Sequence, residues 1–305
     1  MLSHKPYQCP PWLLEKAAHK PAVRTAVAAA AAPLPIASAM AAAEHGLIEP
    51  VLVGDAASIR RIAKELDWPL EGAEIVDVED VEKAGERAAE IAGAGEAGAV
   101  MKGQIHTDAF MKAILRREAG LRTDRRITHI FHMTIPESER SLLISDAAVN
   151  VSPEPETKMH IIRNAVALAH ALGIEEPRVA LLSATEEVTD SVPSSVAAAE
   201  LAKRAEAEIP GALVYGPLAF DNAVSPEAAE IKNIDHPVAG NADILVVPDI
   251  ETGNALFKMM VYFMSACAAG IVAGAKVPIV LTSRADPPEA RLAAAAIAAI
   301  QADAG

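Results

Sequence analysis

The sequence predicts an α/β fold built on parallel sheets, and three observations support this prediction. Short apolar strands alternate with helices along almost the whole chain. These strands are nearly continuous apolar runs, which is typical of strands covered by helices on both faces. Polar residues gather just beyond the carboxyl ends of two strands, in residues 248–254 and 282–289, where open α/β sheets place their ligands.

The first half of the chain begins with an irregular or short helical lead over residues 1–22. Residues 23–32 predict a buried strand or the start of a helix, because their alanines carry no period. Asp55 is a candidate N-cap, and Gly46 a candidate helix end. The later elements expected in this half are helix 33–45, strand 50–54, helix 56–66, strand 74–78, helix 81–92, strand 99–102 and helix 107–118.

In the second half, two adjacent strands at 127–133 and 141–144 interrupt the alternation with an antiparallel-looking pair. The βα pattern then returns with helix 156–172, strand 179–182, helix 194–207, strand 212–215, helix 226–232 and strand 243–247. A polar loop with Gly253 and Asn254 is expected next, followed by a long helix that includes Cys267. Strand 277–281 and a helix after Pro288 end the chain.

The polar stretch 150–156 predicts a domain boundary near Val149. A chain of 305 residues is long enough for two domains. We expect residues 1–148 and the returning segment 281–305 to form an N-terminal α/β domain. Residues 149–280 are then expected to form a second α/β domain.

Composition and motifs exclude several classes of function. A net charge of −14 argues against broad nucleic-acid binding. No apolar run reaches the length of a membrane span and the N-terminus lacks the features of a signal peptide, so we expect a cytoplasmic protein. His129 and His132 are three apart on a predicted strand and point to opposite faces, so no metal site is expected. Residues 93–98 match G-x-G-x-x-G but follow a helix, so they predict a helix end and turn.

The segment after strand 99–102 is a candidate phosphate site. It turns at Gly103 and enters a helix with Thr107 as a possible N-cap. Free backbone N–H groups at such a turn attract phosphate, and Lys102, His106 and Lys112 supply positive charge or donors. An ordinary βα loop with a capping threonine is the alternative interpretation.

Three further polar residues follow predicted strands. Ser145 and Asn150 end one strand, where such side chains line a site or satisfy backbone groups at a domain crossover. Asn254 either lines a ligand site beyond its strand or caps the helix from Ala255.

Ser283 and Arg284 directly follow a buried strand and are the strongest local signal. An arginine beside a hydroxyl suits bidentate recognition of a phosphate. Asp286 and Glu289 lie within one turn of them. These carboxylates either accept a proton in catalysis or cap the last helix.

Taken together, these segments resemble the phosphate acetyl/butyryltransferase family (phosphotransacylases). The resemblance covers about residues 100–290 in family order, through MKGQIHTDAFMKAIL, LLISDAAVNVSPEPE, VALLSA, YGPLAFDNAV, HPVAGNADILVVPDIETGNALFKMM and VPIVLTSRAD. The LTSRAD ending looks closer to the butyryl-type branch. The resemblance implies two α/β/α domains with a cleft between them, like the isocitrate/isopropylmalate dehydrogenases, and usually a homodimer.

The resemblance also implies reversible transfer of a short-chain acyl group between coenzyme A and inorganic phosphate, with coenzyme A as a substrate and no cofactor. The acetyl-type motif S-R-G-C-S-x-x-D has an acid where this chain has Ala290, so Asp286, Glu289 or a residue outside the motif is the base. We expect that base to activate the coenzyme A thiol. Ser283 would then hydrogen-bond the reacting carbonyl oxygen or the leaving phosphate, and Arg284 would clamp phosphate.

Two alternatives remain open. Ala290 supports a non-catalytic coenzyme A or acyl-phosphate binding protein of the same fold. A metal-dependent decarboxylating dehydrogenase would need clustered aspartates, whereas Asp243, Asp249 and Asp286 are scattered across different strand ends. The apolar stripe Phe257, Met260 and Met264 predicts core or dimer interface.

Overall fold

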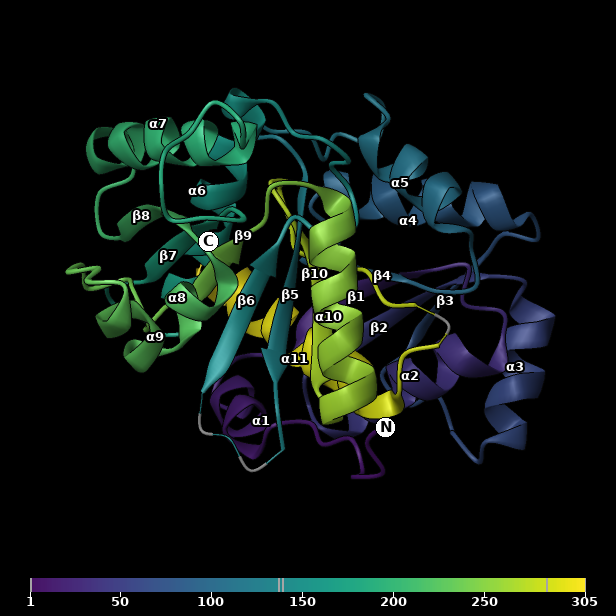
Figure 1. Cartoon of the computed structure of the whole chain (residues 1–305). Coiled ribbons are helices and arrows are strands. Elements are labelled where there is room, and N and C mark those ends of the chain that lie inside the picture. The colour runs from purple at the N-terminus through teal and green to yellow at the C-terminus, as the bar shows by residue number, and fades with distance from the viewer. Residues whose placement is uncertain (1, 137, 139, 284, 305) are drawn as a thin grey trace. The chain divides into compact units, whose positions relative to one another are not determined.

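The computed structural model describes residues 2–136, 138, 140–283 and 285–304 (Figure 1). The chain divides into two compact units. The middle unit comprises Arg126–Ala268 with the residues before Tyr7, and the terminal unit comprises Tyr7–Arg125 with the residues from Ala269 on. These boundaries fall earlier in the chain than the 148/149 and 280/281 boundaries expected from the sequence.

The sheet of the terminal unit has the strand order β3-β2-β1-β4-β11-β10. Its strands are β1 (Val23–Ala28), β2 (Ile48–Gly54), β3 (Glu74–Asp77), β4 (Ala99–Lys102), β10 (Cys267–Ala273) and β11 (Ile279–Val280). All neighbouring pairs from β3 to β11 are parallel, and β10 runs antiparallel to β11. The carboxyl ends of β1, β4 and β11 therefore meet at one edge.

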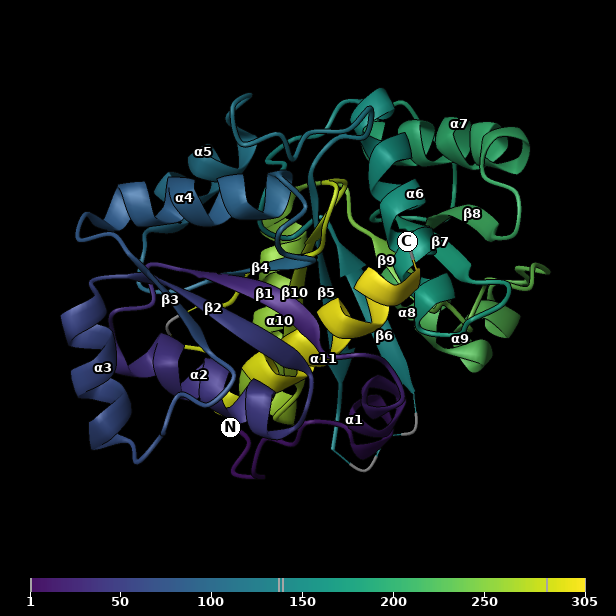
Figure 2. The same cartoon turned by 180° about the vertical axis from the view of Figure 1, so that it is seen from behind.

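The helices of the terminal unit follow strands as βα units, except the first, which precedes β1. They are α1 (Pro11–Ala18), α2 (Pro33–Glu44), α3 (Ala56–Glu65), α4 (Val81–Gly93), α5 (Thr107–Leu115) and α11 (Pro288–Ala304). Asp55 begins α3 by accepting a hydrogen bond from the Ser58 N–H at 2.8 Å, which confirms the predicted cap. Helix α11 buries a long row of alanines, and Figure 2 shows it beside α1.

The middle unit has the strand order β5-β6-β9-β7-β8. Its strands are β5 (Thr128–Thr134), β6 (Ser141–Ser145), β7 (Arg178–Leu182), β8 (Leu213–Leu218) and β9 (Ile244–Val246). Strands β5 and β6 are antiparallel, as the sequence predicts, and the other neighbouring pairs are parallel. Because β6 pairs directly with β9, the antiparallel pair belongs to this unit.

Five helices accompany this sheet within the described ranges. They are α6 (Pro155–Ala171), α7 (Pro193–Glu208), α8 (Phe220–Val224), α9 (Pro226–Ile231) and α10 (Ile250–Met264). Figure 1 shows α10 lying along β5 and β6. Phe257 of α10 stacks on Phe131 of β5 with ring centroids 4.0 Å apart, so this helix contributes to the core.

The predicted polar loop at Gly253 and Asn254 is wrong, because both residues lie among the first five residues of α10. Asp249 is the N-cap, and its carboxylate accepts from the N–H of Thr252 at 2.8 Å. The cap begins the helix several residues earlier than the expected start at Ala255.

The prediction that Cys267 lies in a helix is also wrong. Helix α10 ends at Ser265, which adopts φ 52°, and the chain then enters β10. The neighbouring alanines favour a helix, but Ile271 and Val272 are β-branched and pair with β11 in register.

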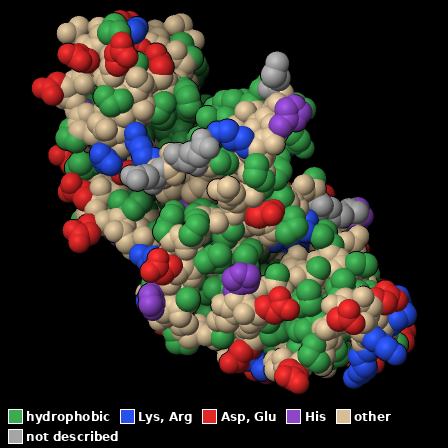
Figure 3. Space-filling view, turned by 90° about the horizontal axis from the view of Figure 1, so that it is seen from below, with side chains coloured by type: hydrophobic (Ala, Val, Ile, Leu, Met, Phe, Trp, Pro, Cys, Tyr) green, Lys and Arg blue, Asp and Glu red, His purple; other side chains and the backbone are tan. Residues whose placement is uncertain are grey.

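Two further features concern the apolar character of the helices and the charge of the surface. Among the described residues, no helix combines the length and apolar character needed to cross a membrane. Figure 3 shows acidic side chains scattered between hydrophobic patches on one face, in keeping with the net charge of −14.

Candidate active site

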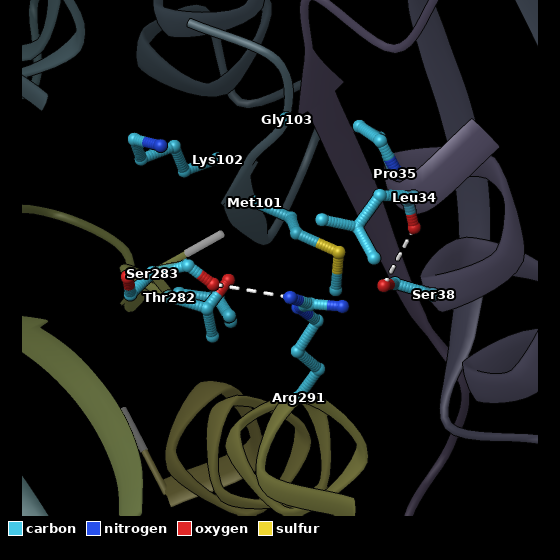
Figure 4. A pocket seen from close by; sticks show the side chains of 10 residues that line it. Leu34, Pro35, Ser38, Met101, Lys102, Gly103, Thr282, Ser283 and Arg291 are labelled. Carbon is cyan, nitrogen blue, oxygen red and sulfur yellow. Dashed lines mark hydrogen bonds between the residues drawn. The ribbon is translucent and has the colours of Figure 1, made fainter. Parts of the chain in front are cut away.

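A small pocket lies in the terminal unit, where β4 and β11 end (Figure 4). Its polar side chains come from α2, the end of β4, the segment after β11, and α11. The lining consists of Leu34, Pro35, Ser38, Met101, Lys102, Gly103, Val280, Thr282, Ser283 and Arg291. The pocket therefore combines two hydroxyls after β11 with two basic side chains.

The turn after β4 is held against the end of β1. The N–H of Gly103 donates to the Ala28 carbonyl, and that of Gln104 donates to the Ala29 carbonyl, both at 2.9 Å. The N–H groups of Gly103 and Gln104 are thus engaged by the protein, and phosphate binding by the rest of this turn stays a prediction. Lys102 remains as the basic side chain of this segment that lines the pocket, with 8% of its surface exposed.

Gly103 has little room for a side chain, which gives a stability prediction. A Cβ at this position would lie 2.3 Å from the Ala28 carbonyl oxygen and 2.6 Å from that of Ala29. We expect Gly103→Ala to lower the free energy of unfolding by about 1–3 kcal/mol, because backbone atoms of β1 must move. Urea denaturation measures this loss.

Gly98→Ala is the matched control for that substitution. Its Cβ would contact only the Cγ1 of Val23, at 3.0 Å, and this side chain can shift. If Gly98→Ala and Gly103→Ala are equally stable, the close approach of the two chain segments does not constrain position 103.

A hydrogen-bonded turn joins Ser283 and Asp286 after β11. The Asp286 carboxylate accepts from the N–H of Ser283 at 2.6 Å, and the Asp286 N–H donates to the Ser283 carbonyl at 3.2 Å. The N–H of Ala285 donates to the Ser283 hydroxyl oxygen at 3.2 Å. This turn presents the hydroxyl and the carboxylate of two candidate catalytic residues next to each other.

Arg291 reaches the same turn from α11, as Figure 4 shows. Its Nη2 donates to the Ser283 carbonyl at 3.1 Å, and only 6% of the residue is exposed. Arg291 did not emerge from the sequence as a site residue. The sequence does contain a clue to its importance, because Arg291 is the one basic residue in the alanine-rich segment 288–304.

Burial and the neighbouring groups shift the pKa of Asp286 in opposite directions. Burial raises the pKa of the Asp286 carboxyl above its usual value, while the Ser283 N–H, Arg291 and Lys102 lower it. Burial likewise lowers the pKa of the Arg291 guanidinium, and Asp286 opposes that change. The net upward shift favours Asp286 as a proton acceptor.

Glu289 has different surroundings from Asp286. Burial, followed by the charge of Glu289, raises the pKa of the Cys9 thiol to about 12. Glu289 is thus close enough to affect Cys9, and it is not among the residues that line the pocket. Of the two candidate bases, Asp286 is the one bonded to Ser283.

The other candidates from the terminal unit lie away from the pocket lining or outside the described residues. His106, Thr107 and Lys112 are exposed on or beside α5. His106 occupies the N-cap position without a side-chain cap, and Thr107 is the first helical residue, so the predicted Thr107 cap is wrong. Arg284 lies outside the residues that the structure describes.

Ser145, Asn150 and Asn254 belong to the middle unit. Ser145 is 0% exposed, and its hydroxyl donates to the His129 carbonyl at 2.8 Å. Asn150 donates to the Asp146 carboxylate at 2.6 Å, and Asn254 is half-buried near the start of α10. Roles for these three in substrate binding stay predictions.

Metal-ligating side chains are dispersed in the described part of the chain. No group of three or more His, Cys, Asp or Glu residues is placed there to hold a metal ion. His129 and His132 are both buried on β5, and burial lowers the pKa of His132 to about 4.

Residues 83–299 match the family described as phosphate acetyl/butaryl transferase. The chain belongs to this family. A phosphate acetyltransferase from Rhizobium meliloti is 50% identical over 265 residues, covering 87% of this chain and 84% of that protein. A phosphate butyryltransferase from Clostridium beijerinckii is 38% identical over 289 residues, covering 94% and 96% of the two chains.

Structural comparison agrees with this membership of the phosphate acetyl/butyryltransferase family. A branched-chain phosphotransacylase from Enterococcus faecalis V583 has a TM-score of 0.79 and 30% identity, covering 92% of this chain and 99% of that one. The resemblance seen in the sequence is thereby confirmed. The relatives carry both acetyl and butyryl names, so the placement near the butyryl-type branch stays a prediction.

The family match also covers most of the pocket. Strands β4 and β11, and the part of α11 that carries Arg291, fall within residues 83–299. All charged side chains that line the pocket therefore belong to the segment this acyltransferase shares with its family, whereas Ser38 precedes that segment.

Proposed function

We propose a site and a mechanism for this phosphate acyltransferase, which exchanges a short-chain acyl group between coenzyme A and inorganic phosphate. The observation that carries the proposal is the turn that binds the Asp286 carboxylate to Ser283 beside Lys102 and Arg291. Coenzyme A is a substrate in this reaction, and no resident cofactor takes part. The enzyme acts in the cytoplasm.

Asp286 is the general base of the proposed reaction. A thiol with a pKa near 8.5 is mostly protonated at neutral pH, so its proton must be removed for attack. Asp286 accepts that proton, and burial raises the pKa of its carboxyl toward that of the thiol. The thiolate sulfur then bonds to the carbonyl carbon of the acyl phosphate, and the bond from that carbon to the phosphate oxygen breaks.

Ser283 and the basic side chains stabilise the charge that develops during this transfer. Ser283 is exposed, and its hydroxyl oxygen accepts from the Ala285 N–H. In this scheme the hydroxyl donates its proton to the carbonyl oxygen of the substrate. Lys102 supplies positive charge to the phosphate, together with the N–H of Leu34 in the first turn of α2, where Pro33 and Pro35 carry no N–H. Arg284 clamps phosphate in this scheme on the basis of its sequence position alone.

The alanine at position 290, where the acetyl-type motif has an acid, is compatible with a catalytic protein. Ala290 is 0% exposed in the first turn of α11, so a longer acidic side chain has no open space there. Asp286 places a carboxylate four residues earlier, next to Ser283. The catalytic function is therefore favoured over the binding-protein alternative.

We further propose a homodimer through α10. The predicted apolar stripe divides in the structure, because Phe257 and Met260 pack into the core while Met264 is 38% exposed. Exposed apolar side chains lie next to it at Met259, Tyr262 and Phe263, which are 41%, 51% and 52% exposed. Such a contiguous apolar surface favours association.

Charged side chains introduced on this apolar surface of α10 test the proposed dimer. Tyr262→Lys combined with Phe263→Glu is expected to convert a dimer to a monomer in sedimentation equilibrium, with the fold retained by circular dichroism. Paired substitution of the exposed residues Arg61 and Glu65 on α3 is the control. A dimer that persists in the α10 variant places the interface elsewhere.

The function itself is tested with coenzyme A and acyl phosphates from acetyl to butyryl, without added metal or nicotinamide. We expect thioester to form, with one chain length preferred. Coenzyme A binding without thioester from any acyl phosphate would contradict the assignment and favour a binding protein.

A further inference from the structure

Arg291 is buried in a position that calls for a reason. It projects from a helix whose buried residues are mostly alanines, and it keeps 6% of its surface exposed. A buried guanidinium is costly unless charged or polar groups surround it. Its hydrogen bond to the Ser283 carbonyl and the nearby Asp286 carboxylate meet that requirement.

The Ser283 carbonyl is the point at which these contacts converge. It accepts from the Asp286 N–H at 3.2 Å and from Arg291 Nη2 at 3.1 Å, while the Ser283 N–H donates to the Asp286 carboxylate. The Ser283 carbonyl thus has two donors, and the Ser283 N–H has the Asp286 carboxylate as its acceptor. These bonds hold Ser283 and Asp286, the two ends of the turn, together. Arg291 thus ties this turn to the rigid helix α11.

We propose that Arg291 is a positioning residue, which holds the Ser283–Asp286 turn in the shape that acyl transfer requires. This inference rests on the proposed function of Ser283 and Asp286. It differs from phosphate binding, because Arg291 acts through the protein groups that it contacts. Small displacements of catalytic groups reduce turnover more than they reduce substrate affinity.

The effect of Arg291 on Asp286 provides a distinctive readout. The described cations that face Asp286 are Arg291 from α11 and Lys102 from β4, and both oppose the rise that burial causes in the pKa of its carboxyl. Replacing Arg291 by a neutral side chain removes one of them, so the pKa of Asp286 rises further. The ascending limb of the rate against pH then moves to higher pH.

The test compares Arg291→Met with Arg291→Lys in the full chain. We expect Arg291→Met to lower kcat about 10–10²-fold with the KM for phosphate changed less than about threefold, and to move the ascending limb upward. Arg291→Lys keeps the charge and is expected to leave that limb near its wild-type position with part of kcat restored. A raised KM for phosphate with unchanged kcat, or an unchanged pH profile in Arg291→Met, would overturn the proposal.

Arg24→Met is the matched control for loss of charge and of a carbonyl hydrogen bond. Arg24 lies in the same unit, pairs with Glu74 and donates to the Glu96 carbonyl at 2.8 Å. We expect its kinetics to match the wild type. If Arg291→Met does not fold, Arg291→Lys still displaces the carbonyl contact and is expected to lower kcat, and wild-type kcat in that variant overturns the proposal.

Hydrogen exchange separates this inference from the function on which it rests. The Ser283 and Asp286 amides are expected to exchange faster in Arg291→Lys than in the wild type, whether or not the protein makes thioester. Failure of wild-type thioester formation would contradict the function alone. Unchanged exchange at these two amides would overturn the positioning role alone.

Discussion

Asp286→Asn is expected to lower kcat for acyl transfer by about 10²–10⁴-fold, which is the usual contribution of a general base. Asparagine keeps an oxygen that can accept from the Ser283 N–H, now at 2.6 Å from the carboxylate, so the turn has a means to persist. The change removes the proton acceptor. Initial rates of thioester formation at saturating coenzyme A measure the loss.

Glu289→Gln decides between the two carboxylates that the sequence offers as bases. The charge of Glu289 raises the pKa of the Cys9 thiol, whereas the Asp286 carboxylate accepts a hydrogen bond from Ser283. We therefore expect the Glu289 variant to lose much less activity than the Asp286 variant. The reverse ranking would identify Glu289 as the base and reject Asp286.

The pKa of Asp286 also predicts how stability depends on pH. Burial raises this pKa in the folded protein, so the folded state binds the proton more tightly than the unfolded state does. The stability from this group is fully present below the unfolded pKa, near 3.9, and is lost as pH rises through the folded pKa. Relative to the wild type, Asp286→Asn should therefore gain stability as the pH rises from the unfolded pKa through the folded pKa. Thermal unfolding at several pH values measures this trend, and a constant difference would contradict it.

The second large effect is expected in the middle unit, where Asp146→Ala should lower the free energy of unfolding by about 3–5 kcal/mol. Asp146 is 1% exposed and accepts from the N–H groups of His129, Ala148 and Val149 at 2.9–3.0 Å, and from the Asn150 amide. Alanine leaves these donors without their charged acceptor. Urea denaturation followed by circular dichroism measures the loss.

Two variants serve as comparisons for Asp146→Ala. Asp146→Asn retains one oxygen and should lose less stability. Asp303→Ala removes an exposed partner of Lys20 and should cost less than about 1 kcal/mol. If Asp146→Ala is as stable as Asp303→Ala, the carboxylate is not the anchor of the segment after β6.

Most of the fold follows from local sequence signals. Asp55 precedes an amphipathic run and caps α3 as expected, and the glycine-rich segment 93–98 separates α4 from β4. Strands β5 and β6 pair antiparallel where two apolar runs stand side by side. In these places the local preference and the packing of the fold agree.

The errors arise where one local preference competes with another. Gly253 and Asn254 favour a loop, but the Asp249 cap begins α10 ahead of them. The alanines around Cys267 favour a helix, but pairing with β11 gives a strand. Tertiary contacts decide such segments, and a single sequence does not contain them in readable form.

The candidate site was predictable in part. Ser283 and Asp286 stand out because polar residues directly follow a buried strand, and the structure joins them in one turn. Arg291 was missed because its distance from Ser283 depends on how α11 packs against the sheet. The bonds of the Gly103 and Gln104 N–H groups could not be read from the sequence, because their acceptors, Ala28 and Ala29, belong to another strand and its exit.

The most direct test of the account is the dependence of acyl-coenzyme A breakdown on inorganic phosphate. The purified protein is mixed with a short-chain acyl-coenzyme A, and free thiol is followed before and after phosphate is added. We predict that thiol appears only after the addition, with an equal amount of acyl phosphate trapped by hydroxylamine. Thiol release without phosphate, or no release with it, would contradict acyl transfer to phosphate as the function of this protein.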